Sequence, residues 1–113
     1  MKQCIPLLTL TVVAAGTIAA HRFVTAAGAQ AGADANTLGV ARTEAVAADK
    51  IPVDVLGTAI VESGAAIAAG ATLETDASGR GITWATSGGK VGIALEAASG
   101  AGEFIEVLLL PNA

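Results

Sequence analysis

The side chains that could do chemistry are few and isolated in this sequence. His21 is the only histidine and Cys4 the only cysteine among 113 residues. Nucleophilic catalysis needs a base held within hydrogen-bond reach by a third group. A disulfide within the chain or a thiolate metal cluster needs further cysteines. The sequence therefore predicts a protein that is not an enzyme, with no cofactor and no metal site, and it places His21 in a surface turn.

Two short motifs look like ligand loops but lack a required part. The stretch "DASGRG", residues 76–81, has the Asp and glycines of a calcium loop without its spaced oxygen ligands. The stretch "SGGKV" ends like a phosphate-binding loop, which needs Gly six residues before the Lys and Ser or Thr after it. Trp84 and Val91 occupy those two positions. Both motifs are predicted to be turns. We also expect Glu103 and Glu106 to be solvated.

The composition predicts a thin core. Hydrophobic residues make up 53% of the chain, but 27 of the 113 residues are Ala and 14 are Gly, against one Trp, two Phe and no Tyr. Burying a whole Leu or Ile contributes roughly 1.5–3 kcal/mol, and an Ala much less. A partner or an oligomer would therefore help to stabilise this chain.

The charges exclude several partners. Six Lys and Arg against ten Asp and Glu give a net charge of −4, without the basic cluster that binding to nucleic-acid phosphates requires. The N-terminal apolar run is shorter than the roughly 20 residues of a membrane span and contains polar groups. We expect neither nucleic acid nor membrane as a partner.

The N-terminus leaves an alternative open. "MKQCIPLLTLTVVAAGTIAA" has the outline of a secretory signal, which would make the protein a secreted or periplasmic small β binding module. Against this, Leu8, Leu10 and Val12 alternate with threonines as in a strand. Residues 12–20 also belong to an internal repeat, so cleavage would remove the front of a structural unit.

The repeat relates the two halves of the chain through slightly drifting offsets. Residues 16–20 fall on 65–69 at an offset of 49, and "GVARTEA" at 39–45 falls on "GIALEAA" at 92–98 at an offset of 53. At an offset of 54, Ile51, Val53 and Val55 fall on Ile105, Val107 and Leu109. The drift indicates short insertions in loops. We take 12–57 and 58–110 as the pseudo-repeats.

Each copy is predicted to be a β unit. Residues 51–61 and 103–110 are rich in β-branched and aliphatic residues and bounded by Gly or Pro, and Ile67 and Leu108 are expected in the core. Recurring Gly disfavours helix, so we allow at most one short helix, at 41–48. The fold class is all-β: a small β-barrel or β-sandwich of two tandem units, as a single domain over 12–113. Residues 1–11 form an N-terminal arm and the entry to the first strand.

Three segments of the second half resemble the capsid cement, or head decoration, family of tailed bacteriophages. They are "VLGTAIV" at 55–61, "GAAIAAGATLETDASGRG" at 64–81 and "VGIALEAASGAGEFIEVLLL" at 91–110. This sequence has Ala71 and Thr72 where the family often has a polar residue and Pro. The resemblance implies a non-enzymatic, mostly β virion protein, made in the host cytoplasm, which binds the outer surface of the assembled head and stabilises it. Its implied partner is the major capsid protein, with self-association on the shell as a trimer rather than a dimer.

Two features are candidates for contact with the capsid or a neighbouring subunit. The first is the arm, which we expect to have no counterpart in the second unit and to add an extended segment to an exposed sheet edge; Pro6 suits an edge position. The second is Trp84, either a core anchor or an interface residue, because Trp is enriched among residues that dominate binding energy. The candidate contact residues are Met1, Lys2, Gln3, Cys4, Ile5, Pro6 and Trp84.

Overall fold

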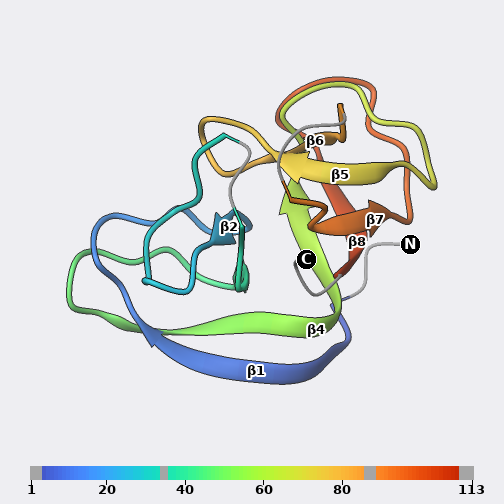
Figure 1. Ribbon diagram of the computed structural model, residues 1–113. Helices are drawn as coiled ribbons and strands as arrows, with labels where there is room; N and C mark the ends of the chain where they lie inside the picture. The colour runs from blue at the N-terminus through green and yellow to red at the C-terminus, as the bar shows by residue number, and fades with distance from the viewer. Residues whose placement is uncertain (1–3, 34–35, 86–88, 110–113) are drawn as a thin grey trace.

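The computed structural model describes residues 4–33, 36–85 and 89–109, and within these ranges it contains strands and turns and no helix. Figure 1 shows two β-rich halves, with the long strand β4 passing from one to the other. The all-β prediction is confirmed. The strands are β1 (Pro6–Val13), β2 (Phe23–Val24), β3 (Gly39–Ala41), β4 (Lys50–Glu62), β5 (Thr72–Thr75), β6 (Gly81–Thr83), β7 (Gly92–Ala94) and β8 (Phe104–Leu109).

All eight strands belong to one sheet with the order β2-β3-β4-β8-β7-β5-β6, and β1 pairs with β4. β4 is 13 residues long and serves both halves. Its first part pairs with β1 and β3, and its last five residues pair with β8. We call residues 6–57 unit 1 and residues 58–109 unit 2, so that β4 spans the boundary.

Each unit nearly closes on itself. In unit 1, the N–H of Ala15, just after β1, donates to the carbonyl of Gly28 at 2.9 Å. In unit 2, the N–H of Gly64, just after β4, donates to the carbonyl of Gly81 at 2.8 Å. The result is the nearly closed, small barrel-like architecture that the sequence predicted.

The two units share backbone contacts at equivalent positions, and the likeness extends toward the N-terminus. The isolated bridge between Ile18 and Ala45 recurs between Ile67 and Ala98, at the sequence offsets of 49 and 53.

The expectation that the segment ahead of Val12 lacks a counterpart is wrong. Val12 pairs with Ile51, and Val61 pairs with Ile105 at the equivalent place. β1 is therefore the counterpart of the second part of β4. This escaped the sequence comparison because β4 is one continuous strand that ends one unit and begins the next.

Backbone geometry repeats as well. His21 (φ 62°) lies where unit 2 has Gly70 (φ 86°), and Ala48 (φ 72°) lies where unit 2 has Gly102 (φ 84°). These are left-handed conformations, which glycine adopts readily and a side chain disfavours. His21 is in a turn, as predicted, although it is half-buried, with its ring edge-on to Phe104 at 5.2 Å between centroids.

Ala48→Gly should raise the melting temperature. The substitution removes the strain of a left-handed alanine, about 1 kcal/mol, which outweighs the added chain entropy of glycine in the unfolded state. Ala47 is also exposed but does not have a positive φ, so Ala47→Gly should lower the melting temperature. Thermal melts of both variants beside the parent protein test this, and similar shifts for both would contradict it.

Two apolar clusters form the core. The cluster inside unit 1 consists of Ala14, Ile18, Val24, Ala41, Ala45, Ile51 and Val53. The cluster inside unit 2 includes Ile67, Leu73, Val107 and nearby residues, and it also takes Phe23, Ala31 and Val40 from unit 1. Residues on the outer face of unit 1 therefore pack into the core of unit 2, so the boundary between the two units is buried.

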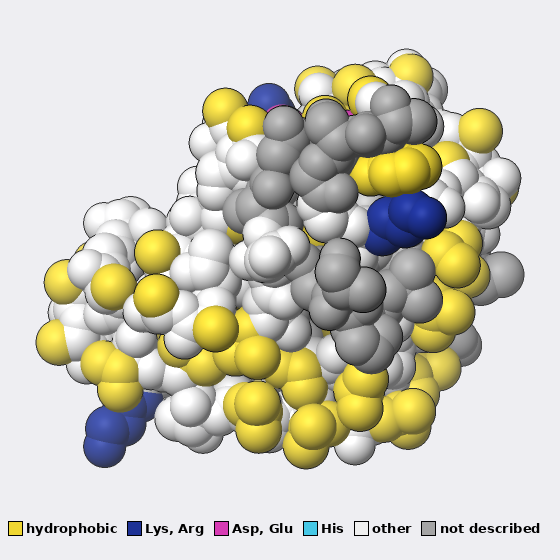
Figure 2. Space-filling view, viewed as in Figure 1, with side chains coloured by type: hydrophobic (Ala, Val, Ile, Leu, Met, Phe, Trp, Pro, Cys, Tyr) yellow, Lys and Arg dark blue, Asp and Glu magenta, His cyan; other side chains and the backbone are white. Residues whose placement is uncertain are grey.

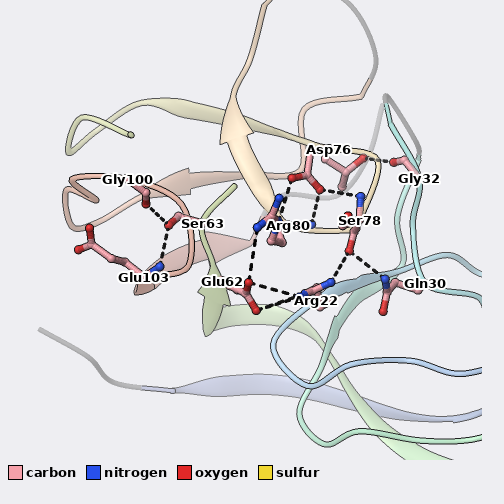
Figure 3. A network of polar contacts seen from close by, with 11 residues as sticks. Arg22, Gln30, Gly32, Glu62, Ser63, Asp76, Ser78, Arg80, Gly100 and Glu103 are labelled. Carbon is pink, nitrogen blue, oxygen red and sulfur yellow. Dashed lines mark hydrogen bonds and ion pairs between the residues drawn. The ribbon is translucent and has the colours of Figure 1, made fainter. Parts of the chain in front are cut away.

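A polar network crosses the same boundary (Figure 3). The guanidinium of Arg22 in unit 1 donates two hydrogen bonds to Glu62 Oε1, at 3.1 and 3.3 Å, and one to the carbonyl of Ser78 at 3.0 Å. Gln30 Nε2 donates to the same carbonyl at 2.9 Å, and Arg80 lies 3.8 Å from Glu62. These contacts fix the relative orientation of the two units.

Two sequence-based expectations about burial are wrong. Ile67 is buried as predicted, but Leu108 is 38% exposed, because side chains alternate along β8 and its neighbours Val107 and Leu109 point inward. Glu106 is buried at 2% exposure.

The short helix allowed at residues 41–48 does not form. The N–H of Ala45 donates to the carbonyl of Ile18 at 2.9 Å instead of to a helical partner. The left-handed φ of Ala48 is likewise incompatible with a helix.

Candidate contact surfaces

Apolar side chains gather on the outside of β1. Figure 2 shows hydrophobic atoms along the lower edge of the molecule, where Figure 1 places β1. A contiguous exposed apolar patch of this kind marks an interaction surface. The exposed large residues of this N-terminal patch are Ile5 (49%), Leu7 (77%), Leu8 (43%), Leu10 (40%) and Val13 (54%).

β1 also has a free edge. Within the described ranges, β4 is the one strand that pairs with β1. The register shifts between Pro6 and Leu8 and between Leu8 and Thr9, which locally disrupts the ladder, as β-bulges do at sheet edges. An edge strand with exposed leucines is a template for pairing with another chain.

The predicted arm is partly bound to its own chain. Ile5 accepts a hydrogen bond from the N–H of Thr58 at 3.0 Å and donates its own N–H to Thr58 Oγ1 at 3.0 Å. Pro6 lies in β1 opposite Gly57. Met1, Lys2 and Gln3 lie outside the described residues. Ile5 and Pro6 therefore hold the N-terminal segment against β4 while the apolar side chain of Ile5 stays exposed.

A buried carboxylate fastens β1 to the barrel. Asp54 on β4 is 1% exposed. Its Oδ1 accepts hydrogen bonds from Thr9 Oγ1 at 2.9 Å and from Arg42 Nη2 at 2.6 Å, and its Oδ2 lies 3.4 Å from the thiol of Cys4. Burial opposes ionisation of the carboxyl, but the hydrogen bonds from Arg42, Thr9 and Cys4 outweigh burial and lower the pKa of Asp54. Burial, followed by the bond to Asp54, raises the pKa of Cys4, which keeps the thiol protonated.

Acid should loosen β1 through Asp54. Because the folded pKa of Asp54 lies below its unfolded value of about 3.9, the charged group stabilises the fold fully above that pH and loses this contribution as the pH falls through the folded pKa. Asp54→Asn should cost about 1–2 kcal/mol at pH 7 and flatten the decline of stability below pH 5. Urea unfolding across pH 2–7 measures this, and parallel curves for variant and parent would contradict it.

Trp84 lies at a half-exposed position directly after β6, outside both core clusters. Its N–H donates to the carbonyl of Thr72 at 2.8 Å, and the ammonium of Lys90 lies 4.4 Å from the ring centroid. Of the two roles left open by the sequence, the structure does not place this ring in the core.

Two chemically reactive residues share one small cavity, but their side chains have other partners. His21 and Cys4 both line a small cavity of about 120 Å³ beside Asp54, but the thiol is hydrogen-bonded to the carboxylate and the histidine faces Phe104. The described residues contain no group of His, Cys, Asp and Glu arranged to hold a metal ion. They also contain no long apolar helix of the kind that spans a membrane.

Sequence reasoning missed the leucines of β1 and the Arg42–Asp54 pair. The signal for the leucines was present: "PLLTLTVV" places apolar residues at consecutive positions, so that some of them must lie on the outward face of a strand. Nothing in the sequence connects Arg42 with Asp54, because the contact depends on the pairing of β3 with β4.

Comparison with known proteins gives two findings. Residues 3–109 match the model of a family described as phage cement protein. The chain is similar in structure to the head fibre gp8.5 N base of bacteriophage phi29, with a TM-score of 0.75 and 19% sequence identity, over 93% of this chain and 95% of that one. At that identity the likeness concerns the fold. No curated protein matches the sequence.

Proposed function

Because the chain belongs to the phage cement protein family, we propose that it decorates the outer surface of an assembled phage head and stabilises the shell. The observation that carries this function is the family match, which spans nearly the whole chain, residues 3–109. The role is structural, and we propose that the protein works without catalysis. A chain that adds contacts to an assembled shell stabilises it by mass action.

The partner we propose is the major capsid protein, met after the chain has folded in the host cytoplasm. The N-terminal patch supports this choice. Ile5, Leu7 and Leu8 present apolar surface beside the free edge of β1, and an extended capsid segment can add to such an edge through main-chain hydrogen bonds. Met1, Lys2 and Gln3 precede this edge, and we propose that they continue the contact.

The position of β1 in the fold speaks against the alternative of a secreted β module. A signal peptide covering the apolar N-terminal run would have to include β1 and the residues that follow it. β1 pairs with β4 over Pro6–Val13 and is fastened by Asp54. Removing that strand would leave unit 1 without the counterpart of the strand that unit 2 retains.

Leu7→Asp tests the capsid contact. Leu7 is 77% exposed, so the variant should fold normally while its occupancy on heads lacking the protein falls at least tenfold, because a charge enters an apolar contact. Val46→Asp, at a residue 59% exposed in another part of unit 1, is the matched control. Co-sedimentation with heads measures occupancy. Full binding by Leu7→Asp would move the capsid contact away from the N-terminal patch.

A further inference from the structure

Some apolar positions that are buried in unit 2 are open to solvent at the equivalent positions of unit 1. Four apolar residues of unit 1 are half-buried or exposed, although their counterparts in unit 2 are all buried. We call the unit 1 set the open face. The pairs, with the unit 1 residue first, are Leu10 and Ala59, Val12 and Val61, Leu38 and Val91, and Val55 and Leu109.

Residues of unit 1 cover these four buried residues of unit 2. Phe23, Ala31 and Val40 point away from the core of unit 1 and join the apolar cluster of unit 2. They are adjacent on the sheet: Phe23 pairs with Val40, and the N–H of Ala31 donates to the carbonyl of Phe23 at 2.9 Å. Val61 and Phe23 both approach Gly81. A row of residues on the outside of unit 1 therefore covers the apolar face of unit 2.

Unit 2 carries the same outward row. Thr72 pairs with Ile93, as Phe23 pairs with Val40. The N–H of Trp84 donates to the carbonyl of Thr72 at 2.8 Å, as Ala31 does to Phe23.

The aromatic residue occupies a different position in each of the two rows. Unit 1 has Phe23 beside Ala31, and unit 2 has Thr72 beside Trp84. Leu108 extends the unit 2 row because it pairs with Ile93. Thr72, Trp84 and Ile93 are half-buried and Leu108 is 38% exposed. We call these four residues the Trp84 row.

We infer that the Trp84 row of one copy of this chain covers the open face of a second copy, continuing between chains the interface that the chain makes between its own units. The occupant is a second copy because the chain already contains this contact once, in the same register. Such a contact is head-to-tail, so it must close into a ring or propagate. A ring on a shell agrees with the trimer that the family resemblance implies.

This inference rests on the proposed function, to which it adds the self-association that the family resemblance implies, and it is separable from capsid binding. The Trp84 row and the open face meet each other, whereas the capsid contact uses the free edge of β1 and Leu7. Leu10 lies in both the N-terminal patch and the open face, so the separating variants are Leu108→Asp, which should lose self-association alone, and Leu7→Asp, which should lose the capsid contact alone.

Trp84 is the only tryptophan in the chain, so its fluorescence reports the proposed contact directly. As the concentration of the purified protein rises, its emission should shift to the blue and acrylamide quenching should fall, in step with the mass measured by light scattering. Leu10→Asp on the open face and Leu108→Asp on the Trp84 row both retain the probe. Each should raise the concentration for half-assembly at least tenfold, whereas Val46→Asp should leave it unchanged.

Mixing the two disrupted variants shows whether the contact is head-to-tail. Leu10→Asp keeps an intact Trp84 row and Leu108→Asp keeps an intact open face, so the mixture should form one-to-one heterodimers at concentrations where each alone is monomeric. Circular dichroism should first show that both variants are folded. A wild-type chain that remains monomeric, or that assembles with unchanged Trp84 emission, would overturn the inference. So would folded variants that fail to recombine.

Discussion

Phe23→Ala should be among the most destabilising single substitutions in this protein, costing about 3–5 kcal/mol. Phe23 is fully buried and is the largest of the buried side chains. It belongs to unit 1 by sequence but lies in the cluster of unit 2, so its removal opens a cavity at the boundary between the units. Against a total stability of about 5–15 kcal/mol, and with a core rich in alanine, this loss should unfold a large part of the population at 37 °C.

Phe104→Ala is the matched control, since Phe104 is the other phenylalanine and is 45% exposed. Truncating it removes the edge contact with His21 from a residue that is already partly in solvent, so the cost should be well below that of Phe23→Ala. Urea unfolding followed by circular dichroism measures both variants. Equal losses for the two would show that Phe23 does not hold the units together.

Gly39→Ala should have a comparable effect for a different reason. A Cβ at Gly39 would lie 2.1 Å from the carbonyl oxygen of Asp54 and 2.9 Å from its carbonyl carbon. Both atoms belong to the backbone of β4, which cannot rotate away as a side chain can. The clash forces β3 from β4 and should cost about 3 kcal/mol or more, at or above the usual range for overpacking.

Gly92, the counterpart of Gly39 in unit 2, should respond in the same way, because its Cβ would lie 2.6 Å from Val107 and 2.8 Å from the carbonyl of Leu108. Gly16→Ala is the control: no atom lies within 4 Å of its Cβ, and its φ is not positive. Thermal melts should show a large decrease for Gly39→Ala and Gly92→Ala and little change for Gly16→Ala. Three equal melting temperatures would contradict the close strand approach.

The repeat and the strand class could be predicted from the sequence because they depend on local patterns. Residues 51–61 and 103–110 alternate well enough to predict β4 and β8, and the offsets of 49, 53 and 54 hold in the register of the strands. The burial of Leu108 was predicted wrongly because an unbroken run of three leucines does not show which of them face the core.

The contacts between the units could not be predicted, because they depend on which face of unit 1 meets unit 2. Phe23 reads as an ordinary core residue of its own unit, and the sequence gives no sign that it lies in the other one. The same holds for Trp84, whose two possible roles differ only in which surface its ring faces. The pairing of Thr72 with Ile93, which repeats that of Phe23 with Val40, supports the proposal that Trp84 is an interface residue.

The most direct test of the capsid role is the heat resistance of phage heads with and without the protein. Heads assembled in its absence are incubated with the purified chain, separated from unbound protein and heated while the release of DNA is followed by a fluorescent dye. We expect bound protein to raise the release temperature by several degrees, in proportion to occupancy, and Leu7→Asp to give no increase. Heads that bind the wild-type chain at full occupancy yet release DNA at an unchanged temperature would contradict a stabilising role, and heads that do not bind it at all would contradict decoration itself.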